Sequence, residues 1–245
     1  PPNEQSGAAC RAFIPASLKP ITSEVLISRI HRGNGLSAGS SQGMFGEILT
    51  LFASTEIFIY VFMEIVTKLE SVQRVLFRKA SIREYAIFVV IFGLFSIFGT
   101  YIGIPWEHGA ISNIRDLAPM VAGLVAGPYI GVAVGLIGGI HRLFLGGDSA
   151  VACCIATILA GFLAGMVNRF LHGKLPGIVP AMIFAVGIEL LHGALALALI
   201  QPFSEAVEIV VALIPAMIIA NSLGLAISII VLHDTKEPEG AGAAD

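Results

Sequence analysis

The stretch "NIRDLAPMVAGLVAGPYIGVAVGLIGGIHRLFLGGDS", residues 113–149, decides how this chain folds. Between Asp116 and Arg142 it carries no formal charge, and glycines recur at every fourth position: Gly123, Gly127, Gly131, Gly135 and Gly139. Small residues at this spacing let the backbones of neighbouring membrane helices approach closely. Pro128 interrupts the ladder, because a proline removes a helical hydrogen bond and clashes with the preceding turn.

Two interpretations fit this interrupted ladder. One is a kinked, tightly packed spanning helix; the other is a broken pair of half-helices that enters the membrane and returns to the same side, which requires burial in protein or a cavity. The basic connectors, 68–84 and 169–174, favour the second interpretation. Such connectors are cytoplasmic as a rule, and both lie on one side only if 117–144 is re-entrant.

The composition is that of a polytopic membrane protein. Hydrophobic residues make up 56% of the 245 residues and charged residues 13%, about half of the ~25% typical of soluble domains; the mean hydropathy is +0.88. A net charge of -3 gives no reason to expect nucleic acid as a partner. Three cysteines without C-x-x-C or His/Cys spacing indicate neither a disulfide framework nor a metal site.

We therefore expect an all-α polytopic membrane protein with five to six transmembrane helices. Stretches long enough to span the hydrocarbon cover roughly 45–67, 85–104, 117–144, 150–171, 178–200 and 206–232. Residues 1–43 are interpreted as a polar, disordered N-terminal extension, 44–233 as one transmembrane domain, and 234–245 as a polar C-terminal tail. Five full crossings plus one re-entrant element place the carboxyl end in the cytoplasm.

Arg115 and Arg142 are the charges that most need an explanation. In one straight helix, 27 residues would separate them by about 40 Å, and they could not share a ligand. If the chain folds back at Gly127–Pro128, they approach each other on the outer side. Two guanidinium groups then bind a carboxylate or phosphate; alternatively, each arginine snorkels separately to a membrane interface.

Other polar residues at membrane depth are candidates for the same site, since intramembrane ionisable groups are often functional. Cys153 and Thr157 share a helix face, where they either complete an anion pocket or simply pack. Glu189 and His192 are spaced to pair or to line the cavity, and Asn221 is placed to hydrogen-bond across helices. No catalytic motif is present, so the chain by itself is expected to be neither an enzyme nor a cofactor-binding protein.

At these residues the sequence resembles the LytS/YhcK-type five-transmembrane receptor domain of bacterial two-component histidine kinases. The resemblance rests on N-x-R at 113–115, the Gly-Pro at 127–128, H-R-x-x-x-G-G at 141–147, and a following helix rich in small residues. The later segment "ELLHGALALALIQPFSEAVEIVVALIPAMIIANSLGLAI" is similar to the last two helices of that family. Together these motifs cover about 45–232.

The resemblance implies a sensor in the bacterial cytoplasmic membrane, a lipid-embedded homodimer that signals to a cytoplasmic kinase output domain or response regulator. In pyruvate-responding members the N-x-R arginine, the H-R arginine and a helix cysteine hold the ligand. These correspond to Arg115, Arg142 and Cys153, with Asn113 and His141 in the same motifs. A serine that also serves in those members is Ala156 here, with Thr157 next, so a different carboxylate is an open alternative.

Two other classes of protein also fit parts of the pattern. The Gly-Pro-x-x-Gly-x-x-x-Gly run resembles substrate-capturing subunits of energy-coupling-factor transporters, although N-x-R and H-R-x-x-x-G-G match the sensor family better. The third possibility is a structural partner that packs through its glycines and uses both arginines as anchors.

Overall fold

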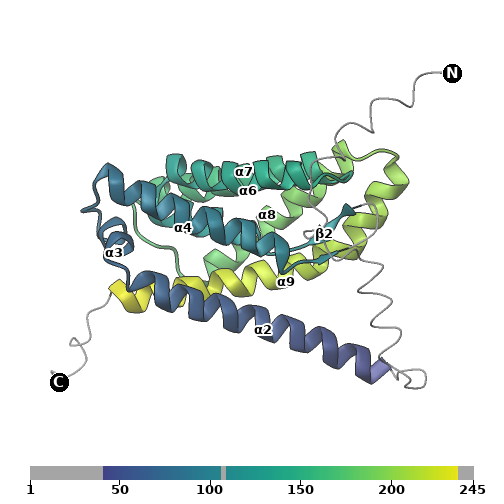
Figure 1. Cartoon of the computed structure of the whole chain (residues 1–245), viewed down its shortest axis with the longest axis horizontal. Helices are drawn as coiled ribbons and strands as arrows, with labels where there is room; N and C mark the ends of the chain where they lie inside the picture. Colours follow the sequence, from purple (N-terminus) through teal and green to yellow (C-terminus); the bar gives the residue numbers. More distant parts are fainter. Residues whose placement is uncertain (1–40, 106–108, 237–245) are drawn as a thin grey trace, which may run out of the picture. The chain divides into compact units, whose positions relative to one another are not determined.

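The computed structural model describes residues 41–105 and 109–236, and residues from Thr50 onward form one compact unit. Its elements are α2 (Ser41–Thr67), α3 (Glu70–Leu76), α4 (Ile82–Tyr101), β1 (Ile104–Pro105), β2 (Ile111–Ser112), α5 (Leu117–Ala126), α6 (Pro128–Leu145), α7 (Ala150–Phe170), α8 (Ile178–Leu199) and α9 (Phe203–Lys236) (Figure 1). The expected extension and tail lie outside the described residues, except 41–43 and 234–236, which belong to α2 and α9.

The described helices confirm the polytopic membrane fold. Five of them, α4, α6, α7, α8 and α9, are long and apolar enough to cross a membrane by length and composition. Every span expected from the sequence coincides with a helix or, at 117–144, with a pair of helices. The two strands form only a two-residue antiparallel pair between Ile104–Pro105 and Ile111–Ser112. Helices satisfy their own backbone groups, which is what a bilayer requires of the chain.

The Gly127–Pro128 junction folds α6 back along α5. Gly127 ends α5 with φ at 89°, a conformation that side chains disfavour and glycine adopts freely. Pro128 then begins α6, where its missing N–H costs nothing because the first N–H groups of a helix have no intrahelical partner. The backbones of Gly123 and Gly131 approach each other and both meet Gly161 of α7. The predicted fold-back is therefore confirmed.

The two arms of this hairpin differ in length. α5 has 10 residues and α6 has 18, because the chain at 113–116 forms an irregular segment and a turn instead of continuing the helix. Protein groups satisfy this irregular backbone: the Ile114 N–H donates to the Gly99 carbonyl at 3.4 Å, and the Ser96 hydroxyl donates to the Arg115 carbonyl at 3.0 Å. Irregular backbone at membrane depth is stable when it is buried in protein in this way.

The basic connectors meet at one end of the bundle. The Arg78 guanidinium, in the connector after α3, packs against Gly173 in the connector after α7. His233 near the end of α9 lies 3.1 Å from the Pro176 carbonyl oxygen in that second connector. Asn168 at the same end of α7 donates to the Leu124 carbonyl at 2.6 Å, so the tip of the α5–α6 hairpin points to this end. The positive-inside rule predicts that this end faces the cytoplasm.

Substituting Gly161→Ala tests the contact that holds the hairpin against α7. A Cβ at Gly161 would collide with the backbone of Gly131, so we expect the free energy of unfolding to fall by about 2 kcal/mol, as in other overpacked cores. The matched control is Gly187→Ala, where an added Cβ meets nothing within 4 Å; there the helix should gain roughly 0.5–1 kcal/mol. Equal stability of the two variants in detergent unfolding would contradict the packing.

Cysteine labelling in intact cells tests the topology. One cysteine is added in turn at the exposed positions Asp148, Lys79 and Lys174 in a Cys10→Ser background, in which the remaining native cysteines, Cys153 and Cys154, are buried. We expect a membrane-impermeant maleimide to label Asp148→Cys directly and the other two variants only after permeabilisation, because the hairpin keeps both basic connectors on the inner side. Labelling of Lys79→Cys and Lys174→Cys from opposite sides would exclude the fold-back.

Candidate functional site

Arg115 is fully buried in the bundle just before α5. Asn113, two residues earlier, accepts the Arg115 backbone N–H on Oδ1 at 3.0 Å and donates from Nδ2 to the Ile111 carbonyl at 2.7 Å. This turn is one that asparagine side chains form readily, and it explains the N-x-R spacing. The Arg115 side chain donates from Nε to the Thr157 hydroxyl at 2.9 Å. Its terminal nitrogens, Nη1 and Nη2, are buried without a hydrogen-bond partner among the described residues.

Asp116 is the acidic partner of this arginine, and it is fully buried as well. Its Oδ1 lies 3.7 Å from Nε of Arg115 and 2.5 Å from the Thr157 hydroxyl. That hydroxyl also lies 2.8 Å from the Cys153 carbonyl oxygen. Since a hydroxyl carries one proton, it can donate to only one of these two oxygens at a time. Thr157 thus joins α7 to both charged residues at the start of α5.

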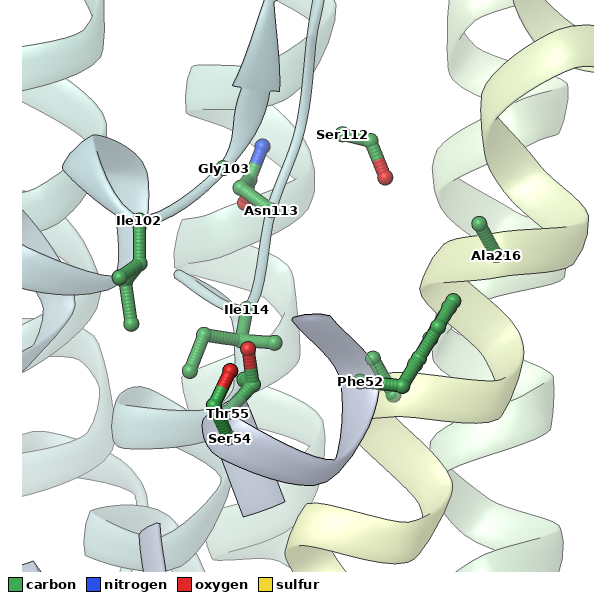
Figure 2. Close-up of a pocket in the computed structure, with 10 residues that line it drawn as sticks. Phe52, Ser54, Thr55, Ile102, Gly103, Ser112, Asn113, Ile114 and Ala216 are labelled. Carbon is green, nitrogen blue, oxygen red and sulfur yellow. The ribbon is translucent and has the colours of Figure 1, made fainter. Parts of the chain in front are cut away.

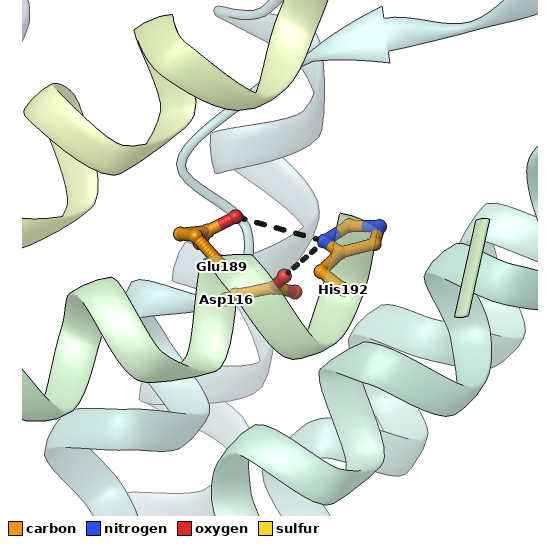
Figure 3. A group of neighbouring side chains, drawn as sticks. All are labelled: Asp116, Glu189 and His192. Carbon is orange, nitrogen blue, oxygen red and sulfur yellow. Dashed lines mark ion pairs between the residues drawn. The ribbon is translucent and has the colours of Figure 1, made fainter. Parts of the chain in front are cut away.

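His192 links Asp116 to Cys153. Its Nδ1 lies 3.0 Å from Oδ2 of Asp116 and its Nε2 lies 3.3 Å from the Cys153 sulfur. Glu189, one turn earlier on α8, places Oε2 at 3.7 Å from the same Nδ1 (Figure 3). Asp116, Glu189 and His192 are buried and offer ligand atoms within 4.8 Å of one another, a spacing that also suits a cation. The positive charge of Arg115 beside Asp116 opposes that use.

Arg142 is the second fully buried arginine, in the last turn of α6. Its Nη2 donates to the Gly109 carbonyl at 2.8 Å and to the Ser149 hydroxyl at 3.0 Å, and its Nη1 donates to the Gly146 carbonyl. Gly146 and Gly147 have φ values of 74° and 91°, which glycine adopts without strain. The two glycines of H-R-x-x-x-G-G therefore turn a carbonyl back onto the arginine. Nε has no partner among the described residues.

The other candidates occupy different places. His141 lies beside Tyr101, with Nε2 3.2 Å from the phenolic oxygen and the ring centroids 5.3 Å apart. Asn221 of α9 donates to the Asn113 carbonyl at 3.2 Å and to the Met217 carbonyl at 3.1 Å, so it ties α9 to the turn that carries Arg115. The structure thus gathers Arg115, Thr157, Cys153, Glu189 and His192 around Asp116 and sets His141 apart.

Asp116 is the member of this cluster that the sequence analysis missed. It follows Arg115 directly and precedes an apolar half-helix, and a charged pair in that setting is a signal for a buried ion pair.

Two cavities adjoin these residues. The smaller, about 20 Å³, touches Ser149, Cys153 and His192 and is bordered by apolar residues of α9; it has room for about one water. The larger, about 130 Å³, lies between α2, the end of α4, β2 and α9, and its polar residues are Ser54, Thr55, Ser112 and Asn113 (Figure 2). Through Asn113 the larger cavity borders the turn that holds Arg115.

Buried, partly unsatisfied charges in a helical membrane domain indicate a functional site. The chain belongs to the family described as 5TMR of 5TMR-LYT, whose model matches residues 69–235. This confirms the resemblance seen in the sequence. It also favours the sensor over the transporter subunit and identifies the chain as a multi-pass sensor signalling domain of the bacterial inner membrane.

Curated relatives agree with this assignment. Sensor histidine kinase BtsS of Escherichia coli is 32% identical over 152 residues, which is 60% of this chain and 27% of the relative. Sensor protein LytS of Bacillus subtilis is 32% identical over 156 residues, 57% of this chain and 26% of the relative. The chain therefore spans about a quarter of the length of these relatives. No solved structure matches.

Removing the Thr157 hydroxyl tests the buried network. In Thr157→Val, Nε of Arg115 and Oδ1 of Asp116 lose a partner at a dry site, and we expect the free energy of unfolding to fall by about 1–3 kcal/mol. Thr67→Val is the control: Thr67 is also buried, but its hydroxyl contacts only the Met63 and Glu64 carbonyls of its own helix. A change of less than about 0.5 kcal/mol is expected there. Equal losses would refute a special role for Thr157.

Proposed function

We propose that this domain senses a small carboxylate of the size of pyruvate, which enters from the outer side and is held by Arg115 and Arg142. Cys153 would contact the rest of the ligand, and Asn113 would orient Arg115. The signal would pass to a cytoplasmic histidine kinase output, in keeping with the sensor kinases to which the chain is similar. A homodimer is the assembly expected of such a sensor.

The observation that carries the proposal is the set of unused donors on two fully buried arginines. Nη1 and Nη2 of Arg115 and Nε of Arg142 lack hydrogen-bond partners among the described residues. A buried donor without a partner costs about 1–3 kcal/mol, and more when it is charged. A carboxylate accepts from a guanidinium in a two-point geometry, so a bound acid would remove this penalty.

The charge balance supports an anion in particular. Asp116 lies close to Arg115, whereas Arg142 donates to two carbonyls and one hydroxyl, and no carboxylate of the described residues forms an ion pair with it. The region around Arg142 thus keeps a positive charge in a poorly hydrated place, where electrostatic attraction is strong. Arg115 donates to Thr157, one turn after Cys153 on α7, and Arg142 donates to Ser149, one turn before it, so a ligand at Cys153 would lie near both charges.

A route for the signal follows from the smaller cavity. At about 20 Å³ this cavity holds about one water molecule and is too small for pyruvate, so a ligand beside Cys153 has to displace the residues that line the cavity. These residues include Leu213, Ile214 and Met217, which flank Pro215 inside α9. Proline weakens a helix at this point, and α9 continues to the basic end of the bundle. A ligand that binds the displaced arrangement more tightly would shift the population toward it.

Thr157 takes part by orienting Arg115. The family serine is replaced by Ala156, and the neighbouring Thr157 hydroxyl is engaged with Arg115 and Asp116. The ligand would therefore be selected by its carboxylate and by the chemical group that it places against Cys153.

Titration of the full chain in lipid nanodiscs with pyruvate, acetate and pyruvamide tests this function. We expect the two acids to raise the melting temperature and neutral pyruvamide to have no effect. Arg115→Lys and Arg142→Lys keep the charge but lose the planar fork, so each should weaken acid binding at least tenfold, or about 1.4 kcal/mol. Arg83→Lys, at an exposed position at the basic end, is the control. Unchanged acid binding in both site variants would refute the proposal.

A further inference from the structure

Three residues from three helical segments form a chain of close contacts. Cys153 is on α7, His192 on α8, and Asp116 directly precedes α5. The sulfur lies 3.3 Å from Nε2 of the imidazole, and Nδ1 lies 3.0 Å from the carboxylate. All three side chains are buried. A thiol next to an imidazole that a carboxylate orients is the arrangement that activates cysteine nucleophiles.

The order of the groups along this chain suits transfer of the thiol proton. Nδ1 of His192 lies 3.0 Å from Oδ2 of Asp116 as an ion pair, without an aligned hydrogen bond between the two atoms. With the ring proton on Nδ1, beside the carboxylate, the lone pair of Nε2 is directed at the thiol of Cys153. The imidazole can therefore accept the thiol proton while the carboxylate stabilises the positive charge that results. Glu189, 3.7 Å from Nδ1, adds a second carboxyl group on that side of the ring.

We propose that Cys153 is a nucleophile that adds reversibly to the carbonyl carbon of a bound α-keto acid. His192 transfers the proton and Asp116 acts as the positioning residue. This inference rests on the carboxylate-sensing function proposed above and goes beyond it, because the ligand becomes covalently attached to α7.

The addition balances without any further reactant. A bond forms between Sγ of Cys153 and the carbonyl carbon while the carbonyl π bond breaks. The thiol proton passes to Nε2 of His192 and from there to the former carbonyl oxygen, which becomes a hydroxyl group. The product is a thiohemiketal; nothing is oxidised or reduced, no group leaves, and the reverse steps release the acid.

The neighbourhood of the thiol fits an α-keto acid. The small cavity touches Cys153, His192 and Ser149, and Ser149 lies one turn before Cys153 on the same face. The Ser149 hydroxyl accepts a hydrogen bond from Arg142. A carbonyl carbon at the sulfur would therefore place the adjacent carboxylate toward Ser149 and Arg142. The two functional groups of an α-keto acid, one bond apart, match these two neighbours.

Cys154 offers a matched comparison in the same helix. It packs against Gly139 of α6, whereas the imidazole lies at Cys153. The two thiols lie next to each other on α7, and they differ in that His192 contacts the thiol of Cys153.

Solid-state NMR of the full chain in lipid vesicles, with pyruvate labelled with carbon-13 at the carbonyl carbon, detects the adduct directly. We expect a signal of a saturated carbon bonded to oxygen and sulfur in the wild type and in Cys154→Ser, and none in Cys153→Ser. Lactate, which has the carboxylate but no carbonyl, should bind wild type and Cys154→Ser with affinities within a factor of two and should give no such signal in either.

The rate of alkylation by 3-bromopyruvate, followed by mass spectrometry of the intact chain, tests the proton transfer. Here a bond from sulfur to the methylene carbon forms as bromide leaves. We expect His192→Gln to slow alkylation of Cys153 at least tenfold, and Asp116→Asn to slow it as well. A purely structural role would leave the rate unchanged in every variant that still binds lactate.

The outcomes separate the two proposals. Suppose that pyruvate and lactate both raise the melting temperature, but the labelled carbon of bound pyruvate still gives the signal of a ketone. Covalent capture is then wrong and carboxylate sensing stands. If neither acid raises the melting temperature, carboxylate sensing fails and covalent capture fails with it. An adduct in Cys153→Ser, or equal alkylation rates in wild type and His192→Gln, would also overturn the inference.

Discussion

The contact between the backbones of Gly131 and Gly161 is the constraint on which the rest of the structure depends. It presses α6 against α7 with no side chain between them, which is how small residues associate helices where lipid provides no hydrophobic driving force. With α6 fixed in this way and the chain reversed at Gly127, the segments before α5 and after α6 reach the same end of the bundle. The two arginines can serve one site only because of this reversal.

The buried charges are the second consequence of the hairpin. Isolated charges at membrane depth are costly, and here they are arranged so that each has some protein partners while several donors and acceptors stay unused. Asp116, Thr157 and His192 tie three helices together, so the same groups that stabilise the bundle also limit the positions in which a ligand can bind. At the proposed site, the stability of the bundle and ligand recognition would therefore be coupled.

Much of the fold could be predicted from the sequence, because its causes are local. The apolar spans follow from hydropathy, the reversal from Gly127–Pro128, and the shared end of the basic connectors from charge placement. The unequal arms of the hairpin could not be predicted, since the irregular chain at 113–116 is held by contacts with residues far away in the sequence, among them Gly99 and Ser96. For the site, Arg115, Cys153 and His192 could each be identified as candidates. The contact of His192 with Cys153 could not be predicted, because the spacing of residues in the sequence does not determine how the two helices that carry them are rotated relative to each other.

The irregular segment at residues 113–116, just before α5, also sets the depth of the site in the membrane. Arg115 is held at the level of Ser96, five residues before α4 ends at Tyr101, which is about 8 Å along the helix and roughly a quarter of a ~30 Å hydrocarbon layer. A full crossing of one charge is worth about 2.3 kcal/mol per 100 mV, so an anion that descends to this level experiences about 0.6 kcal/mol per 100 mV. With the cell interior negative, the membrane potential opposes that descent, so an energised cell would hold the proposed anionic ligand less tightly than a depolarised one.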